Sequence, residues 1–156
     1  MTVRPATRSD ENAILILLDE FRTDCMEQIT GKIVKSNTAK TGGSLIYKSL
    51  LNRKDYCILL LINQDLSIVG IITGYLCPML RNGQVRAEVE EFFVKKEARS
   101  NGNAKLLMNV FFEWCKKNNV QKINLESENG LLRAHKFYEK YGFEIKARRY
   151  VKKLVS

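Results

Sequence analysis

The pattern of hydrophobic and polar positions predicts a short strand and then a helix at the start of the chain. Thr2 to Ala6 is typical of an opening strand, and Ser9 or Asp10 can cap the helix that follows. The apolar residues of this helix recur at helical spacing, at Ile14, Leu17, Leu18 and Phe21. Lys32 to Ser44 contains glycines and small polar residues, so we interpret this segment as a loop that serves as a mobile lid.

Three strands are predicted between residues 56 and 94. Tyr56 to Ile62 is a continuous apolar run, and Ser67 to Leu76 is rich in β-branched residues. Asn63 to Asp65 separates the two runs as a turn, so we expect them to form a hairpin. A second turn, Arg81 to Gln84, leads to the third strand, Val85 to Val94.

Beyond residue 94 the pattern changes to helices that alternate with strands. A basic loop containing Gly102, Arg99 to Ala104, precedes a helix that ends at Asn118 and Asn119. The apolar stripe of this helix is formed by Leu107, Phe111 and Trp114 or Cys115. Ile123 to Leu125 follows as a short strand.

The last part of the chain is predicted to hold one more helix and two strands. The helix runs from Leu131 to Tyr141, and Gly142 is its stop signal. Residues 143–155 are expected to form two closing strands around Lys146 to Arg148.

Together these elements define the fold class as α+β, or mixed α/β. Residues 85–94 and 122–126 flank a crossover helix, so we expect them to pair in parallel with a right-handed connection. The expected architecture is a central, twisted, mixed but mostly antiparallel sheet of about seven strands, flanked by about four helices. No repeat, low-complexity tract or proline-rich linker divides the sequence, so residues 1–156 are expected to form a single domain.

Composition and charge narrow the class of protein. The chain has 156 residues, of which 45% are hydrophobic, enough for one globular core. The net charge is +9, and residues 85–156 hold +7 of it, because they carry sixteen basic and nine acidic side chains. Such a surplus attracts phosphates without sequence preference, so a nucleic-acid-binding module is one function to consider. No helix, zinc or RNA-stacking signature accompanies the charge, which makes nucleic acid an unlikely partner.

Cysteine usage and hydropathy bear on metals and on location. The four cysteines are spread through the chain, at Cys25, Cys57, Cys77 and Cys115. They show no metal-ligand spacing and His135 is the one histidine, so no metal site is expected. No apolar stretch follows the N-terminal basic residues, and the run Tyr56 to Ile62 is far shorter than the roughly 18 residues of a membrane span. We therefore predict reduced thiols in a cytoplasmic protein without a membrane partner.

The segment from Val89 to Leu107 contains the strongest chemical signal. Its loop lies between a predicted strand and a helix, so backbone amides and the helix N-terminus meet at one place and form an anion site. Gly102 and Ala104 let a pyrophosphate approach the backbone, while Arg99 and Lys105 add positive charge. The alternative is that Gly102 only permits a turn. The loop lacks the glycine patterns of a nucleotide P-loop or a dinucleotide fold, so ATP and NAD are disfavoured.

Two motifs in the chain resemble those of the GNAT N-acetyltransferase superfamily. Arg99-Ser-Asn-Gly102-Asn-Ala104 fits the acyl-CoA pyrophosphate signature Q/R-x-x-G-x-G/A. The stretch AHKFYEKYGF, from Ala134 to Phe143, is similar to the second motif, A-x-x-F/L-Y-x-x-x-G-F. The resemblance covers essentially the whole chain. It implies an acetyl-CoA-dependent N-acetyltransferase with a GNAT-like sheet that is splayed where CoA binds.

The resemblance also implies which residues bind the cofactor. The loop residues would hold the CoA pyrophosphate: Arg99, Ser100, Asn101, Gly102, Asn103, Ala104 and Lys105. Phe92 and Val94, on either side of Phe93, would bind the pantetheine arm through their backbone, as an added strand does. His135 occupies a position that recurs in some aminoglycoside and aminoalkylphosphonate acetyltransferases, where a cofactor contact is weighed against a structural role.

The chain departs from the family at three positions. Leu131 stands where many members have an asparagine that contacts pantetheine, and Asn129 is its candidate substitute. Asn103 replaces a usually aliphatic residue and Ser100 replaces a frequent glycine, which alters the loop without removing its anion site.

Candidate catalytic residues follow from the same resemblance. The stretch VEEFFV is very similar to a strand of polyamine acetyltransferases in which the first acid, here Glu90, is the proposed base; histone-type members place a glutamate at Glu88. An alkyl ammonium with a pKa of about 10.4 needs a proton acceptor at neutral pH, and Tyr138 can protonate the departing thiolate. On a regular strand Glu91 points to the opposite face, although a bulge would reset this alternation.

Three matters stay open at this stage. A CoA-binding sensor that has kept the fold and lost the reaction is an alternative to the enzyme. The acids at positions 88, 90 and 91 favour a cationic acceptor such as a polyamine, an aminoglycoside or a protein lysine. The basic residues elsewhere would tolerate an acceptor that also carries a phosphonate or a carboxylate. The oligomeric state, monomer or homodimer, is not decided.

Overall fold

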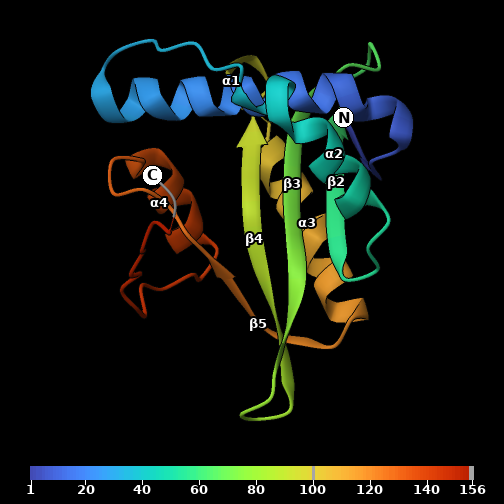
Figure 1. Cartoon of the computed structure of the whole chain (residues 1–156), viewed down its shortest axis with the longest axis vertical. Coiled ribbons are helices and arrows are strands. Elements are labelled where there is room, and N and C mark those ends of the chain that lie inside the picture. The colour runs from blue at the N-terminus through green and yellow to red at the C-terminus, as the bar shows by residue number, and fades with distance from the viewer. Residues whose placement is uncertain (100, 155–156) are drawn as a thin grey trace. The chain divides into compact units, whose positions relative to one another are not determined.

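A computed structural model of the chain describes residues 1–99 and 101–154. The chain divides into two compact units, Met1–Glu126 and Ser127–Ser156. The larger unit holds the sheet and three α-helices, and the smaller unit holds the fourth α-helix (Figure 1). The mixed α+β class predicted from the sequence is therefore confirmed.

One five-stranded sheet with the order β1-β2-β3-β4-β5 forms the frame of the larger unit. Its strands are β1 (Thr2–Pro5), β2 (Tyr56–Ile62), β3 (Ile68–Met79), β4 (Gln84–Val94) and β5 (Val120–Leu125). Neighbouring strands are antiparallel except for β4 and β5, which are parallel. Both the predicted hairpin of β2 with β3 and the predicted parallel pairing across the crossover helix are confirmed.

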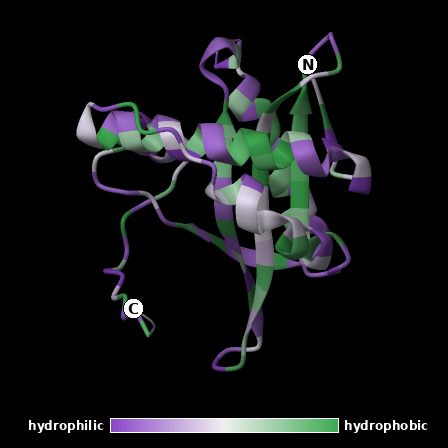
Figure 2. Ribbon diagram, turned by 45° about the horizontal axis from the view of Figure 1, so that its top comes forward, coloured by the Kyte–Doolittle hydropathy of each residue, from purple (hydrophilic) through white to green (hydrophobic). Residues whose placement is uncertain are grey.

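Helices cover both faces of this sheet (Figure 1). One face carries α1 (Glu11–Thr30), which follows the 3-10 turn η1 (Arg8–Asp10), together with α2 (Thr38–Leu51). The other face carries α3 (Asn103–Lys117), which comes after the 3-10 turn η2 (Lys96–Ala98). The core beneath α1 and α2 consists of Ile14, Leu17, Tyr47, Ile58, Leu60, Ile62, Ile71 and Phe93. Figure 2 shows many hydrophobic residues in the central strands and a mixture of hydrophobic and hydrophilic residues along the helices.

The segment Lys32 to Ser44 was predicted to be a loop, but α2 occupies its second half. Asp19 of α1 explains why a helix forms there. Its carboxylate accepts hydrogen bonds from the backbone N–H groups of Ala39 and Lys40 at 3.0 Å, and from the Ser36 hydroxyl at 2.8 Å. These bonds satisfy amides in the first turn of α2, as a capping side chain would. Burial raises the pKa of Asp19, but the hydrogen bonds outweigh it and the net shift is downward.

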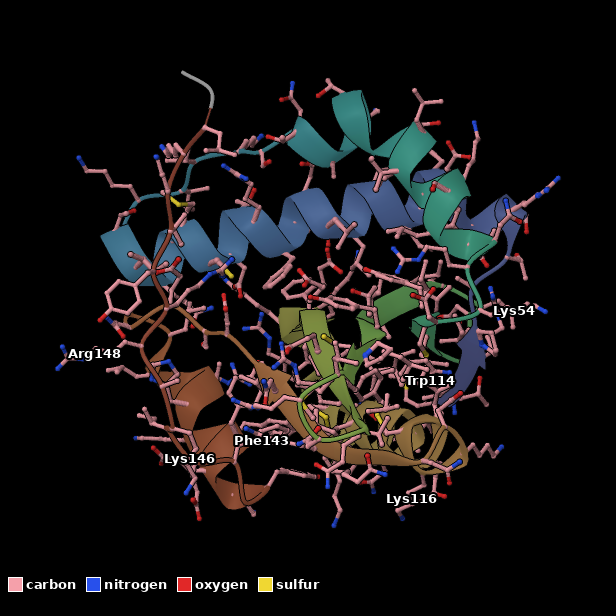
Figure 3. The ribbon with its side chains drawn as sticks, turned by 60° about the horizontal axis from the view of Figure 1, so that its bottom comes forward. Lys54, Trp114, Lys116, Phe143, Lys146 and Arg148 are labelled. Carbon is pink, nitrogen blue, oxygen red and sulfur yellow. The ribbon has the colours of Figure 1, made fainter. Side chains whose placement is uncertain are left out.

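The apolar stripe predicted for α3 is confirmed. Leu107 and Phe111 are fully buried, and Cys115 is almost so. Trp114 is half-buried and lies beside Phe111, with ring centroids 5.4 Å apart. Lys116, on the same helix, is exposed. Trp114 and Lys116, both labelled in Figure 3, therefore mark the half-buried and the solvent-exposed side of α3.

The four cysteines are free thiols, as predicted. Cys57 and Cys115 are buried, whereas Cys25 and Cys77 are half-buried. Burial raises the pKa of Cys57 and of Cys115 to about 12, so neither is suited to act as a nucleophile. Within residues 1–99 and 101–154, the helices are all too short or too polar to cross a membrane.

The smaller unit contains α4 (Leu132–Lys140). The chain turns after it as predicted, with the Gly142 N–H donating to the Glu139 carbonyl at 3.0 Å. The two closing strands predicted for residues 143–155 do not form in the described part of that segment, so the sheet has five strands rather than about seven. A segment with an alternating pattern forms a strand only when another strand pairs with its backbone. The described residues of this unit contain no strand that could do so.

Candidate active site

A β-bulge interrupts the pairing of β3 and β4 at two adjacent glutamates. At this point β3 contributes one residue, Thr73, and β4 contributes two, Glu90 and Glu91. The backbone N–H of Glu91 donates to the Thr73 hydroxyl oxygen at 3.1 Å, which closes the bulge. The regular alternation expected for this strand therefore does not hold, and Glu91 lies with Thr73 instead of on the opposite face.

Glu91 is a candidate base, a role that the sequence analysis did not give it. It is half-buried, and the Thr73 hydroxyl donates to its Oε2 atom. Burial raises the pKa of Glu91 to about 7, and the charge of Glu90 adds to the shift. A carboxyl group that ionises near neutral pH is suited to accept a proton from an amine. Two adjacent acids inside a strand pattern were the only sequence signal for such a bulge.

The two glutamates predicted as candidate bases differ in their surroundings. Glu88 accepts a hydrogen bond from Asn124 Nδ2 at 3.1 Å, and Arg86 Nε lies 2.7 Å from its carboxylate. Glu90, in the bulge, is exposed. Because Glu88 already holds a cation and an amide, Glu90 is the more accessible of the two for an incoming amine.

Two tyrosines lie beside these acids. Tyr56 and Tyr75 stack with ring centroids 6.3 Å apart and 9° between their planes. Burial raises the pKa of Tyr56 to about 12, and the carboxylate of Glu91 adds to the shift. Burial also raises the pKa of Tyr75. The negative charges of Glu90 and Glu88 raise this pKa further, by smaller amounts. The tyrosines were not predicted as site residues, because the register that pairs them is not visible in the sequence.

β4 extends beyond its parallel partner, as expected for a sheet that is splayed at a ligand site. The β4–β5 ladder ends at the Val89–Leu125 pair, whereas β4 continues to Val94. Lys95 directs its N–H to β3, and backbone groups alternate in direction along a strand. The backbone groups of Val94 and Phe92 therefore face the side where β5 has ended.

The loop before α3 presents backbone amides and a helix N-terminus. Asn101 and Gly102 have φ angles of 57° and 76°, in the left-handed region. The first hydrogen bond of α3 runs from Leu106 N–H to the Gly102 carbonyl at 2.9 Å. The amides before it belong to Asn103, Ala104 and Lys105. Lys105 is also exposed, so an anion site of the predicted kind can form here; Ser100 lies outside the described residues.

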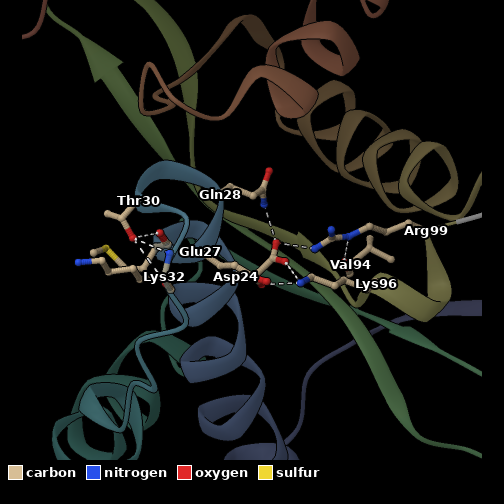
Figure 4. A network of polar contacts seen from close by, with 9 residues as sticks. Asp24, Glu27, Gln28, Thr30, Lys32, Val94, Lys96 and Arg99 are labelled. Atoms are coloured by element: carbon tan, nitrogen blue, oxygen red, sulfur yellow. Dashed lines mark hydrogen bonds and ion pairs between the residues drawn. The ribbon is translucent and has the colours of Figure 1, made fainter.

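Two polar side chains of this loop turn inward. Asn103 is buried, and its Nδ2 donates to the Ala98 carbonyl at 2.9 Å. Arg99 donates from Nη2 to the Asp24 carboxylate at 2.6 Å and from Nε to the Val94 carbonyl at 2.7 Å (Figure 4). Both residues were predicted as cofactor contacts. Their side chains contact Asp24, Val94 and Ala98 in the structure, and their role toward the cofactor stays a prediction.

The remaining predicted residues lie elsewhere in the chain. Phe93 is buried in the core beneath α1 and α2. Asn129 lies in the turn that precedes α4, and His135 and Tyr138 lie on α4, all in the smaller unit. The roles of these three residues stay predictions from the family resemblance.

Comparison with known proteins identifies the family. Residues 19–143 match the model of the acetyltransferase (GNAT) family. The chain therefore belongs to the GNAT acetyltransferase family, whose members use acetyl-CoA, as the two sequence motifs indicated. A comparison with curated proteins finds no match.

Solved structures support the same fold. A transcriptional regulator from Bacillus halodurans C-125 superposes with a TM-score of 0.78 at 20% identity, covering 98% of this chain and 99% of the other. An aminoglycoside acetyltransferase from an uncultured soil metagenomic sample gives a TM-score of 0.77 at 16% identity, over 99% and 98% of the two chains. A ribosomal-protein-alanine N-acetyltransferase from Brucella melitensis biovar Abortus 2308 gives 0.73 at 18% identity, over 98% of each chain. At such identities the likeness concerns the fold.

Proposed function

We propose that this protein is an N-acetyltransferase that moves an acetyl group from acetyl-CoA to a primary amine. The observation that carries the proposal is the combination, in the larger unit, of a stretch of β4 that extends past its pairing with β5, an amide-lined helix N-terminus and a pair of glutamates in the bulge. The edge and the helix N-terminus suit an extended arm that ends in a pyrophosphate. The glutamates suit an ammonium group that must lose a proton.

The chemistry assigns different tasks to different residues. Acetyl-CoA supplies the acetyl group as a thioester. Glu90, with Glu91 beside it, accepts the proton that the ammonium must lose before its nitrogen attacks, directly or through water. The family resemblance gives Tyr138 the task of protonating the thiolate that leaves, since a phenol with a pKa of about 10 is a weak acid matched to a thiolate of about 8.5.

The acceptor class follows from the charges and rings beside the bulge. Glu90 and Glu91, together with the stacked Tyr56 and Tyr75, present carboxylates and aromatic rings on one part of the sheet. Carboxylates pair with ammonium groups, and aromatic ring faces attract cations. A cationic amine such as a polyamine, an aminoglycoside or a protein lysine therefore fits better than an anionic acceptor.

Calorimetry with acetyl-CoA tests the proposed cofactor. Wild-type protein is expected to bind it, and binding is expected to stabilise the fold by about 2.7 kcal/mol at a hundredfold excess over Kd. Gly102→Val is expected to abolish this binding, because a side chain would stand where the pyrophosphate approaches the amides.

Gly83→Val is the matched control for this experiment. Gly83 and Gly102 have φ angles of +65° and +76°, and an added Cβ meets no atom within 4 Å at either position. Both substitutions therefore carry the same backbone strain, but only Gly102 lies at the proposed anion site. Equal binding by a folded Gly102→Val variant, or no binding by the wild type, would contradict the proposal.

Tyr138→Phe tests the proposed acid. The change is expected to lower kcat by tenfold or more, on the order of the lower end of general acid catalysis, while Kd for acetyl-CoA stays the same. The hydroxyl is needed only as charge develops on sulfur, so its loss affects turnover and leaves binding intact. Steady-state kinetics and calorimetry on the same preparation separate the two. An unchanged kcat would remove Tyr138 from the mechanism.

The alternative of a CoA-binding sensor makes a different prediction for the same assays. A sensor binds acetyl-CoA but releases no thiol when it is offered a panel of diamines, aminoglycosides and lysine peptides. Thiol release with any of these amines supports the enzyme. Binding without release across the whole panel supports the sensor.

A further inference from the structure

We propose that Asp24 of α1 is a positioning residue for cofactor binding and acts through Arg99. The inference rests on the proposed function, namely that the loop before α3 receives the CoA pyrophosphate. Arg99 is the first residue of the pyrophosphate signature, and the obvious expectation is a direct contact with phosphate. Its guanidinium instead points to α1, where Asp24 belongs to neither family motif.

The ion pair between Arg99 and Asp24 is short and largely buried. Arg99 Nη2 lies 2.6 Å from Asp24 Oδ2, and the two side chains are 15% and 8% exposed. If Arg99 swung out to a ligand, it would leave a buried carboxylate without its main partner, which is costly. The pair is therefore expected to persist when the cofactor binds.

Neighbouring residues hold both members of the pair in place (Figure 4). Gln28 Nε2 donates to Asp24 Oδ2 at 2.8 Å, and Lys96 Nζ lies 3.4 Å from the other carboxylate oxygen. The guanidinium of Arg99 also lies over the ring of Phe93, 5.5 Å from its centroid. These contacts fix the orientation of Asp24 within its own helix and fix Arg99 against the sheet.

The second hydrogen bond of Arg99 reaches the end of β4. Its Nε donates to the Val94 carbonyl at 2.7 Å, where the strand gives way to η2 and the loop. Asp24, Arg99 and Val94 thus form one chain of contacts from α1 to the start of the loop. This link braces the start of the segment that leads to the amides of Asn103, Ala104 and Lys105, and a site ordered in advance loses less entropy on binding.

The experiment compares two ligands, CoA and pantetheine, which lacks the pyrophosphate. Asp24→Asn and Arg99→Lys are each expected to weaken CoA binding by about tenfold, equivalent to about 1.4 kcal/mol, and to change pantetheine binding much less. The double variant is expected to be no weaker than the worse single variant, because both changes break the same link. Titration calorimetry gives the affinities, and thermal unfolding confirms that each variant is folded.

A direct role of Arg99 predicts the opposite outcome. Asp24→Asn would then release the guanidinium toward the ligand, so CoA affinity would stay the same or rise while Arg99→Lys still lost affinity. That result would overturn the proposal. Equal losses for CoA and pantetheine would also overturn it, because they would mean a general loss of structure.

Two further variants keep the experiment decisive. Lys116→Gln removes an exposed ion pair with Glu113 near the C-terminal end of α3 and leaves the Arg99 contact in place, so CoA affinity is expected to stay the same. Asp24→Glu keeps the negative charge at position 24 but shifts the guanidinium of Arg99. It replaces Asp24→Asn in the experiment if that variant does not fold. Wild-type protein that binds no CoA would contradict the proposed function itself. Wild-type binding with an unchanged Asp24→Asn variant would contradict only the role of Asp24.

Discussion

Replacing Glu90 by Gln is expected to lower the rate of amine acetylation about 100-fold near neutral pH. An alkyl ammonium is almost fully protonated there, so the reaction depends on a group that accepts its proton. The loss is expected to shrink as rising pH deprotonates the amine without help. Affinity for acetyl-CoA should stay the same, because Glu90 lies in the bulge and not in the loop before α3. Initial rates against pH, with calorimetry for the cofactor, provide the measurement.

Glu88→Gln is the built-in control for this experiment. Glu88 is already engaged by Arg86 and Asn124, so its replacement should change the rate far less than Glu90→Gln does. A large loss only at Glu88 would assign the base to that position. No loss in either variant, with activity present, would mean that water takes the proton.

Glu91→Gln separates the roles of the two adjacent acids through the pH profile. Burial raises the pKa of Glu91 to about 7, so its carboxyl is neutral below that pH and ionised above it. If the reaction needs ionised Glu91, the wild-type rate rises as pH passes through 7, and the variant loses this rise.

The stability of the fold depends on pH in the opposite direction to the rate. The raised pKa favours the folded state at low pH and this contribution is lost as pH rises through 7, so Glu91→Gln should lessen that loss.

Gly74→Val is expected to be the most damaging single change to the stability of the sheet. A Cβ atom at this position would lie 2.5 Å from the Glu88 carbonyl oxygen and 2.8 Å from Cζ of Phe111. One of these neighbours is backbone and the other is a fully buried ring, so neither can move aside at low cost. We expect a loss of about 3 kcal/mol or more in the free energy of unfolding, measured with urea.

Gly42→Ala is the control for this substitution. Gly42 lies inside α2, and an added Cβ meets no atom within 4 Å. Alanine has the higher helix propensity, so this change is expected to stabilise the protein by about 0.5–1 kcal/mol. A Gly74→Val variant as stable as the wild type would show that β3 and α3 pack less tightly than the structure indicates.

Most of the larger unit could be predicted from the sequence because its elements carry clear local patterns. The apolar run of β2 and the helical stripe of α3 are local signals, and both were confirmed. The start of α2 could not be predicted, because Asp19 caps it from another helix nineteen residues before Thr38. The predicted closing strands depended on a pairing partner, which is a tertiary condition.

In the candidate site, too, features within one continuous segment could be predicted, whereas contacts between residues distant in sequence could not. Its motifs identified the loop before α3 and the glutamate strand, because both lie in continuous segments. The inward turn of Arg99 depends on Asp24, 75 positions away in the chain. The bulge depends on Thr73 in the neighbouring strand. No local pattern encodes either contact.

The stretch of β4 that extends past its pairing with β5 has a consequence for the behaviour of the protein at high concentration. A strand edge with open backbone groups is a template on which another molecule can add a strand, the first step of aggregation. In β4 this edge begins at the bulge, where two carboxylates and a local twist oppose such pairing. The glutamates are therefore expected to serve a second purpose beside the proposed proton transfer: they hinder other copies of the chain from adding a strand where we propose that the cofactor binds.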